Sequence, residues 1–158
     1  MSVKKLEFYI KASSLFRVPL LFFCRPKLLS IQPTAKARIP LFWATRNHYG
    51  SMYFGALSMG AELSVALPLL EEIFLKNRKV NFLFKDFQAE FLKRADDDVI
   101  FEFQQVNELI KFIDECETQN TRLNKTFSGK AYSNSTPDKI YMTYNITLSI
   151  KPSTKPLS

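Results

Sequence analysis

The sequence is poor in the residues that build disulfide frameworks and metal centres. It holds two cysteines, Cys24 and Cys116, and one histidine, His48, in 158 residues. The cysteines lie far apart without metal-ligand spacing, so the pattern predicts free thiols in a reducing compartment. Because no phosphate-binding loop or dinucleotide motif occurs either, we expect no cofactor and no metal, and we expect a cytoplasmic protein.

The N-terminal region has no hydrophobic run long enough to cross a bilayer. The stretch LFRVPLLFFC, residues 15–24, is interrupted by Arg17 and Pro19 and has no cleavage site, so it fits neither a transmembrane helix nor a signal peptide. Repeats and low-complexity tracts are absent from the sequence. A hydrophobic content of 46% with 15 Phe is enough for one domain with a sizeable core.

The charge is unbalanced, with a net value of +7, but no run of five basic residues occurs. Such an excess either serves solubility or attracts an acidic partner, which includes a membrane surface, a nucleic acid or a phosphate-bearing ligand. A nucleic acid fits least, because no single element interleaves cations with exposed aromatic residues.

One stretch, residues 47–73, is small and apolar for about five helical turns. A segment that is apolar on nearly all sides predicts a buried helix, and we expect Pro68 to kink or end it. The only ionisable group in its apolar part is Glu62. Because a carboxylate is seldom buried without a partner or a task, Glu62 is the first candidate for a functional residue.

Hydrophobic periodicity predicts the remaining elements. They are an amphipathic helix over 3–17, an extended segment over 28–42, strands over 80–91 and 99–103, a surface helix over 104–117, and strands over 126–132 and 139–150. This order predicts an α+β fold with an antiparallel sheet and helices on one face. We expect a helical segment at 1–24, a main domain at 25–151 and a loose tail at 152–158. The N-terminal helix packs on the sheet edge or a partner subunit, or contacts a membrane surface.

The spacing N-x-x-G-x-x-Y-F-G-A-L-x-x-x-A-E, from Asn47 to Glu62, resembles the hotdog-fold thioesterase superfamily. It is similar to an uncharacterised thioesterase-like family, a domain of unknown function, whose members carry N-H-x-G-[ST]-M-[FY]-x-G-A-L and then an A-E pair. The resemblance covers residues 28–150. It implies a curved antiparallel sheet wrapped around a long central helix, with the site shared across a homodimer or a dimer of dimers.

The phenylacetyl-CoA-type thioesterases of that superfamily carry Asn-x-x-Gly-x-x-His-Gly-Gly and then an Asp. Against this pattern, Asn47, Gly50 and Gly55 match. The chain departs from it in that Tyr53 stands at the histidine, Phe54 at the first glycine and Glu62 at the Asp.

The resemblance implies a role for each matched residue. Glu62 is the candidate general base, Asn47 the residue that orients water or the carbonyl, and the backbone N–H of Gly55 part of an oxyanion site. Substrate contacts fall on Gly50, Ser51, Tyr53 and Phe54. The candidates for contacts with CoA phosphates are Arg46, Lys85, Lys93 and Arg94.

Each candidate has a structural interpretation as well. Glu62 pairs with Arg46 or a backbone amide in the core, Asn47 is a cap or turn residue, and His48 is a solvated loop residue. Ser51 caps the helix rather than acting as a nucleophile. The remaining candidates serve packing: Gly55 and Gly60 allow close helix–sheet contact, and Tyr53 and Phe54 fill core or line an acyl channel.

Three functions therefore remain open. The first is an acyl-CoA thioesterase-like enzyme, and the second is a non-catalytic acyl-CoA or fatty-acyl binding protein on the same fold. The third is a lipid-handling protein that contacts a membrane surface weakly through its N-terminal segment.

Overall fold

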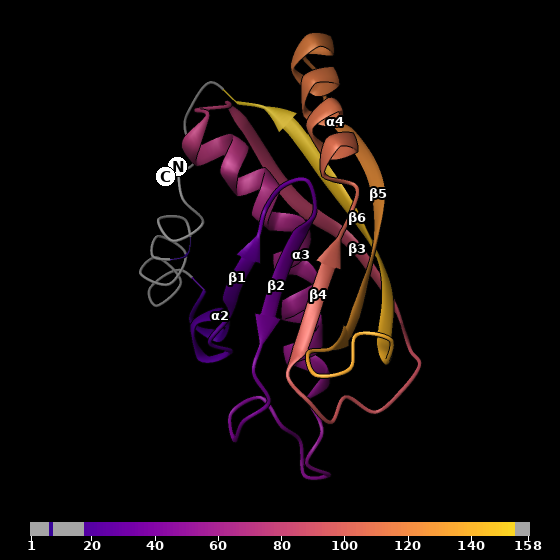
Figure 1. Ribbon diagram of the computed structural model, residues 1–158. Helices are drawn as coiled ribbons and strands as arrows, with labels where there is room; N and C mark the ends of the chain where they lie inside the picture. Colours follow the sequence, from indigo (N-terminus) through magenta and orange to yellow (C-terminus); the bar gives the residue numbers. More distant parts are fainter. Residues whose placement is uncertain (1–6, 8–17, 154–158) are drawn as a thin grey trace.

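The computed structural model describes Glu7 and residues 18–153 (Figure 1). The helix predicted over residues 3–17 and the end of the predicted tail therefore lie outside the described residues, Glu7 excepted. The described elements are α2 (Pro19–Phe23), β1 (Lys27–Ser30), β2 (Ala35–Ile39), α3 (Phe54–Leu75), β3 (Val80–Phe91), β4 (Val99–Phe103), α4 (Val106–Gln119), β5 (Leu123–Ser133) and β6 (Ile140–Pro152).

The strands form one antiparallel sheet in the order β1-β2-β4-β5-β6-β3. The sheet curves, and α3 runs along one of its faces behind β2 and β4 in Figure 1. This arrangement confirms the predicted α+β fold with a long helix packed on an antiparallel sheet. Strand β3 follows α3 in sequence but pairs only with β6, so β3 is an edge strand.

Two details of the prediction are wrong. Residues 28–42, predicted as one extended segment, hold the β1–β2 hairpin, because the chain turns between Ile31 and Thr34. Of the two outcomes expected at Pro68, a kink or an end, the end is wrong, since α3 continues to Leu75 with Pro68 inside it and buried. The missing N–H of a proline removes one backbone hydrogen bond, and the packing around α3 holds the helix through this gap.

Two close contacts fix the position of α3 against the sheet. Gly60 faces the ring of Phe101 on β4, and a Cβ at position 60 would overlap that ring. A second contact joins Ser64 to Tyr144 on β6, whose hydroxyl oxygens lie 2.6 Å apart. In the described part of the chain, α3 alone has the length and hydropathy of a membrane span, but it is the buried core helix of this domain.

Helix α4 covers the same face of the sheet beside α3. Its apolar stripe is buried, and Phe112 stacks edge-on against Phe127 of β5 at 5.8 Å between ring centroids. Asn120 ends the helix in a left-handed conformation (φ 48°), the usual stop signal of a helix C-terminus. The two helices thus cover one face of the sheet, and the other face carries mainly polar side chains.

Candidate functional site

An apolar cavity of about 170 Å³ lies between α2, α3 and β3. The residues of α3 that line it recur at helical spacing and so share one face of the helix. The complete lining is Val18, Leu21, Met59, Glu62, Leu63, Ala66, Leu70, Phe82 and Phe84. Eight of these nine side chains are apolar, and Glu62 is the one ionisable group among them.

The side chain of Glu62 lies among apolar side chains. Partial desolvation raises its pKa, although the residue as a whole remains exposed to solvent. No ion pair or hydrogen bond reaches Glu62 from any described residue, so the pairing with Arg46 considered above is not formed. An unpaired acid at an apolar wall can exchange a proton with water or a ligand.

The buried acid of α3 is a different residue. Glu72 is 1% exposed, and its carboxylate oxygens lie 2.5 Å from the Nζ of Lys76 and 3.6 Å from Arg78. Arg78 also contacts Asp114 and Glu117 of α4. This network ties the end of α3 to α4, so Glu72 has the structural task that sequence patterns suggested for Glu62.

The N-terminus of α3 offers free backbone donors. Tyr53 is the N-cap, and its side chain makes no capping hydrogen bond. The N–H groups of Phe54, Gly55 and Ala56 have no acceptor among the described residues. Together with the positive end of the helix dipole, these groups form an anion-binding arrangement. The ring of Tyr53 leans over Gly55, 2.6 Å from where a Cβ at that position would stand.

The loop before α3 is built around the side chain of Asn47. Its Oδ1 accepts hydrogen bonds from the N–H of Tyr49 at 3.0 Å, the N–H of Ser51 at 3.3 Å and the Oγ of Ser51 at 3.2 Å. Gly50 adopts a φ of 76°, which favours glycine at this turn. The amide oxygen of Asn47 is therefore used within the turn, which leaves its amide nitrogen to contact a ligand.

Two further candidates have structural surroundings that fit no catalytic role. Ser51 is buried and its hydroxyl donates to Asn47. His48 is exposed, and its ring lies 4.0 Å from the ring of Tyr49. Neither residue forms a nucleophile–base pair with another described side chain.

Phe54, the first residue of α3, lies at the surface of the protein. It is 57% exposed, and its ring packs edge-on against Phe91 of β3 at 5.8 Å between centroids. Tyr53 is similarly exposed. Phe54 therefore lies beside the edge strand β3, where a protein placed against that strand would contact it.

The candidate cations gather mainly at the end where α3 begins, the lower end of Figure 1. Arg46 lies in the β2–α3 loop, and Lys93 and Arg94 lie in the β3–β4 loop. Arg94 donates a hydrogen bond to the backbone carbonyl of Tyr49, which ties the two loops together. Lys85 lies elsewhere, at the bulge of β3.

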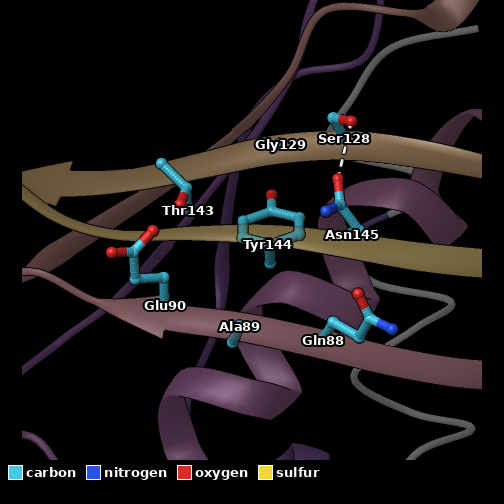
Figure 2. A pocket seen from close by; sticks show the side chains of 8 residues that line it. All are labelled: Gln88, Ala89, Glu90, Ser128, Gly129, Thr143, Tyr144 and Asn145. Atoms are coloured by element: carbon cyan, nitrogen blue, oxygen red, sulfur yellow. Dashed lines mark hydrogen bonds between the residues drawn. The ribbon is translucent and has the colours of Figure 1, made fainter.

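A larger hollow of about 440 Å³ lies on the other face of the sheet (Figure 2). Gln88, Glu90, Thr143 and Asn145 line it, and Ser128 donates a hydrogen bond to Asn145 at 2.8 Å. A neighbouring hollow contains Glu102. Glu102 is ion-paired and its pKa is lowered to about 2, whereas Glu62 is unpaired among the described residues and its pKa is raised, so the cavity at Glu62 is the stronger candidate for acid–base chemistry.

Sequence reasoning missed most of the cavity lining. The i, i+3, i+4 and i+7 spacing of Met59, Glu62, Leu63 and Ala66 was available as a signal. It was hidden because α3 is apolar on nearly every side, so the cavity face looks like the sheet face. The contributions of Val18 and Leu21 come from the fold, which brings α2 against α3.

No protein-family model matches the sequence, and no curated protein sequence matches it. Solved structures do match. A protein of unknown function from Chlorobaculum tepidum superposes with a TM-score of 0.77 at 14% identity, over 95% of this chain and 96% of that one. A candidate thioesterase from Shewanella oneidensis gives 0.74 at 11% identity, over 95% and 100%.

A thioesterase from Haemophilus influenzae is also similar, with a TM-score of 0.65 at 13% identity, over 98% of this chain and 94% of that one. At such identities the similarity concerns the fold. The chain therefore has the hotdog fold that these thioesterase structures share.

Proposed function

We propose that this protein hydrolyses an acyl thioester, such as an acyl-CoA, at the cavity that holds Glu62. The observation that carries the proposal is the unpaired carboxylate of Glu62, with a raised pKa, on the wall of an apolar cavity. An acyl chain is the ligand that apolar walls select, and a general base beside it supplies what thioester hydrolysis needs. The similarity to thioesterase structures supports the same class of reaction.

The chemistry requires one base and one oxyanion site. Glu62 takes a proton from water as the water oxygen attacks the thioester carbonyl carbon. The carbonyl oxygen gains negative charge, which the N–H groups of Phe54 and Gly55 at a helix N-terminus stabilise. When the C–S bond breaks, Glu62 returns the proton to the leaving thiolate, so acid and thiol form and Glu62 is regenerated.

The geometry of one chain does not bring these parts together. Gly55 and Glu62 share a helix face because they are seven residues apart, but about 10 Å of helix axis separates them. A second copy with an antiparallel central helix would place its helix N-terminus near Glu62. The proposed site is therefore shared between two protomers.

The edge strand provides a place for that second copy. The other edge of β3 has no partner in the described part of the chain, and Leu83, Phe87 and Phe91 are exposed along it. The unpaired N–H and C=O groups of an exposed edge strand are a template for pairing with another chain. We propose that β3 pairs with β3 of a second protomer and forms a homodimer.

Light scattering coupled to size-exclusion chromatography tests the dimer. We expect twice the mass of one 18.3 kDa chain. The double variant Leu83→Lys with Phe87→Lys should shift the protein toward the monomer, whereas Asn124→Lys on β5 should not. A monomeric wild-type protein would contradict the proposed site shared between two protomers.

Release of free thiol from a series of acyl-CoA chain lengths tests the catalytic proposal. Wild type should release thiol, and Glu62→Gln should lower kcat by about 10²- to 10⁴-fold, the usual contribution of a general base. Glu71→Gln, on the same helix but outside the cavity, is the matched control and should retain activity. Equal turnover by wild type and Glu62→Gln would contradict the role of Glu62.

A non-catalytic acyl-binding protein is the second candidate. The observation that favours it is the turn around Asn47, which already uses the amide oxygen that would orient a water molecule. Tyr53 also stands where related enzymes have a histidine. Measurable acyl-CoA binding without thiol release at any chain length would favour this function over hydrolysis.

A further inference from the structure

The positive charge of this protein is concentrated in one part of its sequence. No Asp or Glu occurs between Glu7 and Glu62. Seven basic residues do occur there: Lys11, Arg17, Arg25, Lys27, Lys36, Arg38 and Arg46. The net charge of the whole chain is +7, so the remainder of the sequence is balanced. Such asymmetry is typical of a protein that meets an anionic surface.

The same stretch exposes large aromatic residues at the end of the sheet where α3 begins. Trp43 is 74% exposed and Tyr49 is 69% exposed, both in the β2–α3 loop, and Phe23 at the end of α2 is 58% exposed. Trp43 is the only tryptophan in the sequence. Solvent-exposed side chains of this size and number mark an interaction surface rather than scattered exposure.

Two arginine side chains stack over aromatic rings of this region. The guanidinium of Arg25 lies 4.8 Å from the ring centroid of Phe42, which packs edge-on against Trp43 at 6.0 Å. The guanidinium of Arg94 lies 5.9 Å from the ring of Tyr49. We call Phe23, Arg25, Trp43, Arg46, Tyr49 and Arg94 the basic aromatic end. No carboxylate pairs with its three arginines among the described residues.

Acidic residues near this end are already engaged. Asp96 binds Lys139 at 2.6 Å, and its pKa is lowered to about 2, chiefly by the hydrogen bond from Lys139. Asp97 accepts a hydrogen bond from Ser133, and Asp98 accepts one from the N–H of Leu41. Asp96 is thus balanced by Lys139, and Asp98 lies 3.6 Å from Arg38, whereas Asp97 receives hydrogen bonds from neutral groups and keeps its charge. Among the described residues of this loop, one carboxylate without a cation partner therefore opposes the three arginines of the basic aromatic end.

We propose that the basic aromatic end docks on an anionic lipid surface. Arginines attract the negative headgroups, and Trp43, Tyr49 and Phe23 insert at the interfacial level that Trp and Tyr prefer in membranes. Neither interaction suffices alone, because interfacial binding combines buried apolar area with electrostatic attraction. The inference goes beyond thioester hydrolysis and does not depend on it.

The position of α2 links this surface to the apolar cavity. Val18 and Leu21 line the cavity beside Glu62, whereas Leu20 and Phe23, from the same short segment, face solvent. The short segment around α2 therefore exposes apolar side chains to water, which is unfavourable. A lipid surface would cover that side and would bring acyl chains to the cavity.

The single tryptophan makes the proposal directly measurable. The full-length protein is mixed with vesicles of phosphatidylcholine, with or without phosphatidylglycerol, and the emission of Trp43 is recorded. With anionic vesicles we expect a blue shift and quenching by brominated phosphatidylglycerol, because the indole leaves water. Pure phosphatidylcholine should give a much smaller change, and added salt should weaken the binding.

Charge variants identify the surface that binds. Arg46→Glu and Arg94→Glu should each lower the partition onto anionic vesicles at least fivefold, the effect of about one interfacial cation. Lys111→Glu makes the same charge change on exposed α4, away from this end, and should bind nearly as wild type. Circular dichroism establishes that each variant is folded.

Three results would overturn the proposal. One is unchanged Trp43 emission with anionic vesicles at low salt. Another is an equal loss of vesicle binding in Lys111→Glu and Arg46→Glu, which would indicate net charge alone. The third is an oligomeric free protein in which Trp43 is shielded from acrylamide, because the basic aromatic end would then be an interface between copies.

Discussion

The hydroxyl oxygens of Ser64 and Tyr144 lie 2.6 Å apart in the core and form the hydrogen bond that joins α3 to β6. Both residues are buried, and burial raises the pKa of the Tyr144 phenol. Tyr144→Phe should lower the free energy of unfolding by about 1–2 kcal/mol, because Ser64 loses a partner where no water replaces it. Urea denaturation measures the change.

A double-mutant cycle isolates this bond from other effects. Ser64→Ala and Tyr144→Phe together should cost less than the sum of the single changes. Tyr49→Phe, which removes an exposed hydroxyl, should stay within about 0.5 kcal/mol of wild type. Fully additive costs would show that the two hydroxyls do not interact in solution.

The contact between Gly60 and Phe101 predicts an unusual helix substitution. Alanine is favoured over glycine in helices by about 1 kcal/mol, yet a Cβ at position 60 would overlap the buried ring of Phe101. Gly60→Ala should therefore destabilise the protein by about 1–3 kcal/mol in urea denaturation. Ser58→Ala, one half-turn earlier on the same helix, should have little effect, and a more stable Gly60→Ala protein would refute the contact.

The stability of the fold at acid pH should depend on Glu102. Its carboxylate oxygen lies 2.9 Å from the Nζ of Lys36 on the outer face of the sheet. Burial alone would raise the pKa of this carboxyl. Hydrogen bonds from Lys36, Gln104 and Tyr132 outweigh that effect and lower the pKa from 4.5 to about 2. The ionised form thus stabilises the fold above about pH 4.5, and that contribution is lost as the pH falls toward 2.

Lys36→Met should flatten this part of the stability curve, measured by urea denaturation between pH 2 and pH 5. Lys111→Met on α4 serves as the control and should leave the slope as in wild type. A wild-type protein whose stability rises on acidification through this range would contradict the role of Glu102.

Glu62 should have the opposite influence on stability. Its pKa is raised, so the folded state binds the proton more tightly than the unfolded chain does. Stability from this group is present at low pH and is lost as the pH rises through the folded pKa. Glu62→Gln should therefore be slightly more stable than wild type at pH 7, with a smaller difference at pH 4.

Urea denaturation at the two pH values checks this, with Glu90→Gln on the outer face as the comparison variant. A Glu62→Gln protein that is less stable than wild type at pH 7 would mean that the carboxylate has a stabilising partner.

The hydrophobic periodicity of the sequence was sufficient to predict most of the fold. The alternation in β6 and the single apolar stripe of α4 each depend on one buried face, so the sequence pattern predicts them directly. The β1–β2 hairpin was missed because Ile31, Gln32 and Pro33 continue the apolar–polar alternation through the turn. The expectation that Pro68 could end the helix was wrong because propensity is local, whereas the burial of α3 on the sheet decides whether the helix continues.

The candidate site was harder to predict. A helix that is apolar all round does not show which face meets the sheet and which lines a cavity, so Glu62 and Glu72 could not be distinguished by pattern. Tertiary contacts distinguish them: Glu72 is ion-paired with Lys76 and with Arg78, which also binds α4, whereas Glu62 is exposed and lines the cavity formed with α2 and β3. The contribution of α2 to the cavity depends on a tertiary contact that no local pattern records.

The central claim is that the cavity beside Glu62 receives an acyl chain. The most direct test is the affinity of an acyl-CoA series, from acetyl to palmitoyl, for wild type and for Ala66→Phe, which fills part of the cavity. Ser58→Phe places the same ring on α3 outside the lining. We predict that Ala66→Phe alone shifts the preference toward shorter chains, and an unchanged chain-length preference in that variant would contradict the claim.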